Sequence, residues 1–200
     1  MLHIDAERVR ELRHKTGAGM MNCKKALLES NGNFEEAIKS LREKGQASAH
    51  KKVNRKTIEG IVGSYIHIGG KIGVLIEVNC ETDFVARREE FQELVQNLAM
   101  QIAASPDVLY IQSEDIPEEI VLNEKAIESE KEDLKNKPED IKEKIVLGRV
   151  DKTLKNLTLL NQPFIRDANI TVDELIKEKI SLFGENIRLK RFTRYTLGNE

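Results

Sequence analysis

The side chains best suited to chemistry in this sequence are the thiol of Cys80 and the imidazole of His67. A cysteine activated by a histidine is a nucleophile that many enzymes use. Here the two residues are 13 positions apart, on two β-rich runs that read as the strands of one hairpin. Strand residues rise about 3.3 Å each, so this separation predicts positions near opposite ends of the ladder. A thiol enzyme therefore remains only an alternative hypothesis.

Other catalytic and metal-binding patterns are absent from the sequence. The stretch "TGAGM" (16–20) lacks a following Lys and Ser or Thr, which excludes a P-loop. No histidine has metal-ligand spacing with another His or Cys; the four are His3, His14, His50 and His67. Cys23 and Cys80 form no CxxC motif, so we expect two reduced thiols. We therefore predict no enzyme activity, no metal site and no cofactor, and turn to binding surfaces.

Two stretches carry side chains that are typical of partner binding. Met20 and Met21 are adaptable apolar side chains in a glycine-containing stretch. The alternative is that they fill a core at the start of a helix. His67 lies at the end of the predicted hairpin, where the alternative is an ordinary solvated turn residue.

The stretch "NCETDFVAR" (79–87) places Asp83 and Phe84 where a predicted strand gives way to a predicted helix. An acid beside a large ring suits neither a simple turn nor a simple core. One interpretation makes Asp83 a helix N-cap and Phe84 a core ring. The other exposes the ring to a partner. We predict the exposed ring, because Phe84 directly follows a strand end and an acid, where the chain turns toward solvent.

Residues 5–44 read as three short helices that form a compact docking module. Asp5 can cap the first helix, and Asn22 can cap the second. The apolar residues of the third recur with helical spacing; they are Phe34, Ala37, Ile38 and Leu41. Gly45 is expected to stop this helix, and residues 45–56 read as a basic linker or a frayed helix.

The remainder of the chain reads as an α+β core. Two strands from residue 57 onward flank Gly69-Gly70, a hairpin signal. A following helix presents one apolar face, which consists of Phe91, Leu94, Val95, Leu98 and Ile102. Residues 112–145 read as two acidic helical segments, and residues 186–198 as a final strand. This order predicts a small antiparallel sheet with helices packed on one side.

Charge is distributed unevenly along the chain. The formal net charge is −2, but residues 1–56 carry +6 and the rest carries −8. This asymmetry favours oriented docking on a charged partner and is too weak to predict direct nucleic-acid binding. The basic residues of the last strand are expected to protect a solvated sheet face or edge; they are Arg188, Lys190, Arg191 and Arg194. No apolar run is long enough to span a membrane.

Two motifs add a family resemblance. "LRHKTGAGMMNCKKAL" (12–27) and "EVNCETDFVAR" (77–87) resemble the two signature stretches of the elongation factor Ts family. The resemblance implies a guanine-nucleotide exchange factor for elongation factor Tu. It also implies a ubiquitin-associated-like (UBA-like) three-helix domain, which we place at residues 1–50, and a dimerisation core, which we place at 57–200. The basic residues 51–56 between them read as a linker.

The resemblance implies roles for particular residues. The stretch from Thr82 through Asp83 and Phe84 to Val85 matches the family element associated with dislodging Mg²⁺ from elongation factor Tu. The residues matching those that contact the GTPase domain of the partner are Arg13, Met20 and Met21. His67 lies in a stretch similar to one that touches another domain of the partner.

The length of the chain resembles that of the short type in the family. Longer members carry two core copies and an inserted helical hairpin; here we expect one copy, no hairpin and a homodimer through residues 57–112 and the C-terminal strand. A charged N-terminus without the pattern of a signal peptide fits bacterial cytoplasm or a plastid-encoded protein. The alternatives are a UBA-like adaptor and an RNA-binding module that uses residues 51–56 and the last strand.

Overall fold

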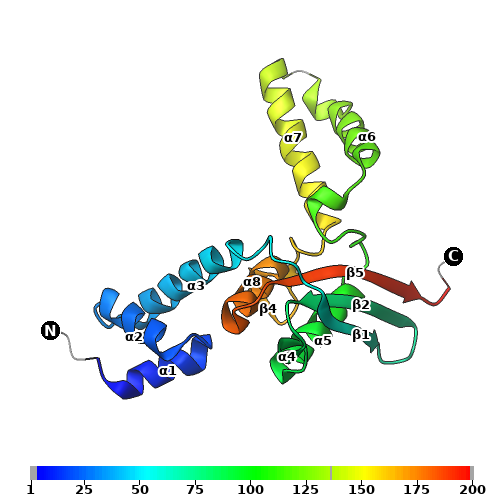
Figure 1. Ribbon diagram of the computed structural model, residues 1–200. Helices are drawn as coiled ribbons and strands as arrows, with labels where there is room; N and C mark the ends of the chain where they lie inside the picture. Colours follow the sequence, from blue (N-terminus) through cyan, green and yellow to red (C-terminus); the bar gives the residue numbers. More distant parts are fainter. Residues whose placement is uncertain (1–3, 136, 199–200) are drawn as a thin grey trace. The chain divides into compact units, whose positions relative to one another are not determined.

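A computed structural model describes residues 4–135 and 137–198, so His3 lies outside the described residues. The fold is α+β, as predicted (Figure 1). The residues pack into two compact units. The first unit contains the chain up to Gly63 together with Ile76–Gln96 and Glu174–Lys190. The second contains Ser64–Leu75, Asn97–Asp173 and the chain from Arg191 onward.

The chain begins with three helices, α1 (Ala6–Thr16), α2 (Met20–Glu29) and α3 (Phe34–His50). Local capping defines two of their starts. The side chain of Asp5 accepts a hydrogen bond from the backbone N–H of Glu7, and that of Asn33 accepts from Glu35 and Glu36. These helices share an aliphatic core, which consists of Val9, Leu12, Cys23, Ala26, Leu27 and Ala37.

Two predictions about these helices are wrong. Asn22 does not cap α2, because Gly19 occupies the N-cap position and Asn22 lies inside the helix. Gly45 does not end α3, which continues to His50. A Cβ at Gly45 would lie 3.2 Å from the Oγ of Ser181, a residue of α8 (Val172–Phe183). This glycine therefore allows α3 to approach α8 closely, which is a packing role rather than a capping role.

The sheet has three strands in the order β1 (Glu59–Ile66), β2 (Ile72–Cys80) and β5 (Ile187–Thr196). The hairpin predicted at Gly69-Gly70 is confirmed, since both glycines lie between β1 and β2 with positive φ. Alternate residues of the central strand are buried, as expected for a sheet covered on one face; they are Val74, Ile76, Val78 and Cys80.

Helix α5 (Glu89–Ala104) runs through both units, and within the first its residue Val95 packs against the sheet at Gly63. A Cβ at Gly63 would overlap the Cγ1 atom of Val95, so only glycine fits this contact. The predicted apolar face of α5 is confirmed, because all five of its residues are buried. The helix ends two residues before Pro106.

Helices α6 (Glu118–Ser129) and α7 (Glu139–Asn156) form a helical hairpin in the second unit, lying side by side in Figure 1. The prediction that no such hairpin is present is therefore wrong. The two helices enclose a small core of their own, formed by Leu134, Val146 and Val150. Leu134 belongs to a short 3₁₀ turn, Glu132–Leu134, in the connection between the helices. Burial of this connecting leucine lets two strongly acidic segments pack together.

The remaining elements are short. The 3₁₀ turn η1 spans Ser113–Asp115, and β3 (Pro163–Phe164) pairs antiparallel with β4 (Asp167–Thr171). The buried Gln101 secures this ribbon: its Oε1 accepts from the Ile165 N–H at 2.8 Å and its Nε2 donates to the Pro163 carbonyl at 3.2 Å. None of the helices within the described ranges has both the length and the apolar character needed to cross a bilayer.

Candidate partner-binding site at the junction of β2 and α4

A single helical turn, α4 (Asp83–Ala86), follows β2 almost directly and presents Phe84 to solvent. The Phe84 side chain is 79% exposed, whereas its neighbours Val85 and Ala86 are 6% and 7% exposed. The backbone of the turn is thus anchored on one side and displays the ring on the other. The interpretation of Phe84 as a core residue is wrong, and its role in partner binding stays a prediction.

Asp83 also differs from the simplest interpretation. Thr82, with φ −129° and ψ 155°, is the N-cap of α4, and Asp83 is the first helical residue. The carboxylate of Asp83 forms an ion pair with Arg87 at 2.9 Å, and both side chains are largely accessible. Exposed ion pairs of this kind contribute only about 0–1 kcal/mol, so a partner can replace Arg87 at little cost.

The residues before α4 are held by a carboxylate from a distant part of the sequence. Glu185 accepts hydrogen bonds from the N–H groups of Glu81 and Thr82 at 3.1 and 3.0 Å, and from the Thr82 hydroxyl at 2.6 Å. In the opposite direction, Glu81 accepts from the Asn186 N–H at 2.6 Å. We call these four residues the carboxylate clasp. The sequence carries no local signal for it, because its halves are 103–105 positions apart.

The buried Cys80 thiol lies at the base of the same junction. Its Sγ donates to the Thr82 carbonyl at 3.1 Å. Burial, and secondarily the negative charge of Glu185, raises the pKa of this thiol to about 11. A thiol with so high a pKa carries very little thiolate near neutral pH, so Cys80 is not an activated nucleophile. Cys23 is also buried, and both cysteines are free.

The methionine pair is exposed at the start of α2. Met21 is 74% exposed and Met20 is 39% exposed, so the interpretation of the pair as core filler is wrong. Leu28, which the sequence analysis did not single out, is 44% exposed one heptad after Met21. Arg13 is exposed in the last turn of α1. These four residues belong to the first unit, as do Thr82 to Val85.

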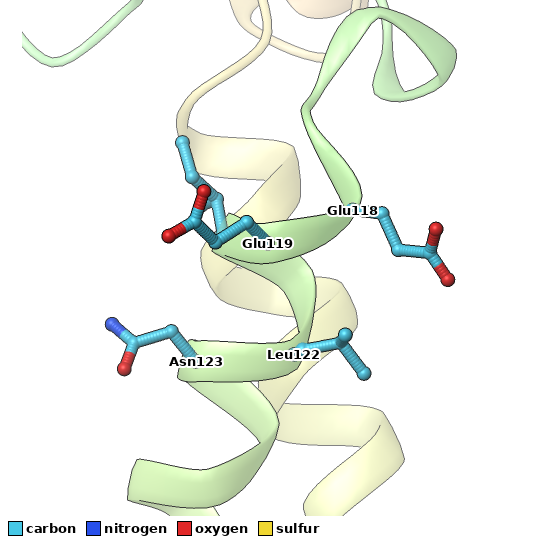
Figure 2. A pocket seen from close by; sticks show the side chains of 5 residues that line it. Glu118, Glu119, Leu122 and Asn123 are labelled. Atoms are coloured by element: carbon cyan, nitrogen blue, oxygen red, sulfur yellow. The ribbon is translucent and has the colours of Figure 1, made fainter.

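His67 belongs to the second unit and directly follows β1. Its ring is exposed, and its Nδ1 lies 3.0 Å from the hydroxyl oxygen of Tyr65. A surface hollow on α6 has a volume of about 650 Å³. Its lining includes Glu118, Glu119, Leu122 and Asn123, whose side chains are drawn in Figure 2. None of the residues singled out from the sequence lines this hollow. Within the described parts of the chain, no cluster of His, Cys, Asp or Glu side chains is placed to hold a metal ion.

The chain is similar to the proteins of one known family along almost its whole length. The sequence model of the family described as "Elongation factor TS" matches residues 9–199. Elongation factor Ts of Rippkaea orientalis is 63% identical over 198 residues, which cover 99% of this chain and 80% of that protein. Elongation factor Ts of Synechococcus elongatus is 62% identical over 99% of this chain and 90% of its own length. The chloroplastic elongation factor Ts of Rhodomonas salina is 62% identical over 98% and 89% of the two chains. The protein therefore belongs to the elongation factor Ts family of translation elongation factors.

Proposed function

We propose that this protein is a guanine-nucleotide exchange factor that binds elongation factor Tu in its GDP-bound and nucleotide-free states. The observation that carries the proposal is the exposed ring of Phe84 on an anchored turn, beside the accessible carboxylate of Asp83. A large apolar side chain held in water has no stabilising role in the isolated fold. It gains about 1.5–3 kcal/mol if a partner buries it.

The proposed mechanism acts on the metal and phosphate site of the partner. Nucleotide affinity in GTPases depends on Mg²⁺, which bridges phosphate oxygens, and on the groups that surround the phosphates. Phe84 enters between partner elements and displaces the loop on the metal side, while Asp83 exchanges Arg87 for a partner donor. Binding is reciprocal: if this protein binds the nucleotide-free partner more tightly than the GDP-bound partner, its binding lowers the partner's affinity for GDP by the same ratio. GDP then leaves, and GTP can bind.

Initial docking is assigned to the helices of residues 1–50, through Arg13, Met20 and Met21. The exposed methionines support this role, since flexible thioether side chains adapt to a partner surface. The positive charge of residues 1–56 would speed the encounter with an acidic partner surface. His67 is a further, independent contact, and we propose no direct contact with nucleic acid.

We also propose that two copies pair through residues 57–112 and the C-terminal strand. Ile66 and Leu75 support this idea, because they are 66% and 50% exposed on one face of the hairpin. Ile66 lies on the same face as Gly73, because a Cβ at Gly73 would lie 3.1 Å from Ile66 Cδ1. Leu75 shares this face, because residues two positions apart in a strand point to the same side. Tyr195 and Leu197 add exposed apolar area near the end of β5.

No catalytic role is assigned to any residue. The high pKa of the buried Cys80 thiol argues against the thiol-enzyme alternative. Similarity to the proteins of Rippkaea orientalis and Synechococcus elongatus and to proteins named as chloroplastic supports a place in bacterial cytoplasm or plastid stroma.

The decisive experiment measures release of fluorescent GDP from elongation factor Tu after addition of a catalytic amount of this chain. Faster release is expected, with Phe84→Ala strongly impaired. Ile165→Ala, which removes a 47% exposed side chain elsewhere, should release GDP like the unchanged protein. Unchanged GDP release would contradict exchange activity. Binding of a ubiquitin-like protein would then favour the adaptor, and steeply salt-dependent RNA binding would favour the RNA-binding module.

A further inference from the structure

We propose that Glu185 is the positioning residue of the exchange site: its carboxylate holds the chain at Glu81 and Thr82 so that Phe84 is presented in one orientation. This inference rests on the proposed function, in which the Phe84 ring acts on the partner. Glu185 itself does not reach the ring. It acts through the backbone of the two residues that precede α4.

Helix α4 is weak by itself. A helix of four residues is far too short to be stable alone, because nucleation costs more than one turn of hydrogen bonds returns. Its N-cap, Thr82, makes no side-chain capping bond. The Thr82 hydroxyl instead donates to Glu185, so the usual local device for starting a helix is replaced by a tertiary contact. The orientation of the turn must therefore come from outside it.

Glu185 makes several charge-assisted hydrogen bonds to the residues before α4. One carboxylate accepts from two successive backbone N–H groups and one hydroxyl. Hydrogen bonds to an ionised acceptor are roughly twice as strong as neutral ones. Three of them onto two adjacent residues restrict both the position and the rotation of the strand end. Burial of Val85 and Ala86 fixes the other side of the turn, and Phe84 is left between these two anchors.

The carboxylate clasp is also bonded to the segment that follows α3. Asn186 is 3% exposed, and its Nδ2 donates to the carbonyl oxygens of Val53 and Arg55 at 3.1 and 2.9 Å. The Arg55 guanidinium also lies 3.5 Å from Glu81. The same turn between α8 and β5 therefore holds the β2–α4 junction and the segment that follows α3. A turn with only a local packing role would not need hydrogen bonds to two distant segments, as Glu185 and Asn186 make to residues 81–82 and to Val53 and Arg55.

A partner-free experiment tests the positioning role directly. The chain contains no tryptophan, so Phe84→Trp creates a single tryptophan at the site, whose fluorescence can be excited selectively over that of the three tyrosines. In that background, Glu185→Ala should lower the fluorescence anisotropy and increase quenching by acrylamide, because the turn becomes mobile. Glu185→Gln should restore most of both values: its oxygen can accept from the two N–H groups and its amide can donate to the Thr82 hydroxyl, although these bonds are no longer charge-assisted. Glu90→Ala is the matched control, since Glu90 is a carboxylate of the same unit that pairs with Arg88 outside the clasp.

The exchange assay tests the consequence. At saturating concentrations of this chain, Glu185→Ala should slow GDP release at least about tenfold, which corresponds to losing one charge-assisted hydrogen bond. The half-saturating concentration of this chain should change less than about threefold, because docking through α1 and α2 is retained. Glu185→Gln should keep most of the rate. In a Phe84→Ala background, Glu185→Ala should add less than about twofold, since both residues act through one ring.

The possible outcomes separate this inference from the proposed function. Unchanged anisotropy in Glu185→Ala, or effects of Glu185→Ala and Phe84→Ala that multiply, would overturn the positioning role. Equal losses in Glu185→Ala and Glu185→Gln would do the same. If Glu185→Ala does not fold, Thr82→Val removes one of the three donors and permits the same comparison. If the unchanged chain fails to speed GDP release, the proposed function fails, while the anisotropy result still decides whether Glu185 positions the turn.

Discussion

The Sγ atom of Cys80 lies 3.1 Å from the carbonyl oxygen of Thr82, to which it donates a hydrogen bond. The last residue of β2 is thereby joined to the N-cap of α4. The sulfur is buried below the turn that displays Phe84, and burial together with the charge of Glu185 raises its pKa to about 11. A structural thiol therefore occupies the position where sequence alone allowed a nucleophile.

Cys80 should make the fold sensitive to alkali. Its pKa rises from an ordinary value of 9.0 to about 11 on folding, so the protonated thiol stabilises the fold fully below pH 9. This stabilisation is lost as the pH rises from 9 toward 11. Alkylation of Cys80 by iodoacetamide, followed by peptide mass spectrometry, should show a midpoint near pH 11 in the folded protein. The same peptide in urea should react with a midpoint near its ordinary pKa. Equal midpoints in both conditions would contradict the prediction.

Phe84→Ala should separate stability from activity. Because the ring is 79% exposed, its removal should change the free energy of unfolding by less than about 1 kcal/mol. GDP release should slow about 10- to 150-fold, which corresponds to about 1.5–3 kcal/mol of lost contact in the complex. Thermal melting and release kinetics on the same samples measure both quantities. Loss of activity only in proportion to unfolding would return the ring to a structural role.

Asp83→Ala should reduce exchange in the same direction as Phe84→Ala. The double variant should lose less than the product of the two single effects, because both side chains serve one displacement. Arg87→Ala is a useful companion, since it frees the Asp83 carboxylate from its ion pair. It should leave exchange unchanged or slightly faster. A double-variant cycle on GDP-release rates decides whether Asp83 and Phe84 act together. Effects of the two substitutions that are independent would contradict a shared role.

Met20→Ala combined with Met21→Ala should weaken docking on the partner more than it slows GDP release from the docked complex. The half-saturating concentration of this chain should rise severalfold, while the maximal rate of GDP release changes little. Stability should fall only slightly, because the core below α2 uses other side chains.

Exchange at low concentrations of the chain should also decline with rising salt, since residues 1–56 carry +6. A salt-independent rate would argue against electrostatic steering.

Leu75→Glu should disrupt pairing of two copies. A charge on the exposed apolar face of the hairpin would have to be desolvated in a dimer, which is unfavourable by several kcal/mol. Light scattering at micromolar concentration should report a dimer for the unchanged chain and a monomer for the variant. Leu122→Glu, on α6, should remain dimeric. A monomeric unchanged chain with full exchange activity would rule out the dimer.

Elements with local signals can be predicted from the amino-acid sequence. The i, i+3, i+4 spacing of Phe91, Leu94 and Val95 predicts a buried helix face, and burial of all three confirms it. Asp5 caps α1 as predicted, because an N-cap bond joins residues two positions apart. The signature stretches around Met20 and Phe84 also indicated the family without any structure.

Features that depend on residues distant in the sequence become visible only in the folded chain. Gly45 lies inside α3, where a Cβ would meet Ser181 of α8, and no local pattern distinguishes such a glycine from one that ends a helix. The α6–α7 hairpin depends on burial of Leu134 against α7 residues, whereas charge pattern alone gave only two acidic segments. Burial of a connecting residue cannot be deduced from spacing within either helix.

The candidate site combines both kinds of information. Sequence placed Asp83 and Phe84 at a strand–helix junction, but either orientation of the ring was compatible with that position. The orientation is decided by the burial of Val85 on one side of the turn and by the bonds from Thr82 to Glu185 on the other. Glu185 is 103 residues from Thr82 and has no sequence pattern of its own. Folding brings the two together, because the N–H groups at the strand end require an acceptor and the returning chain supplies a carboxylate there.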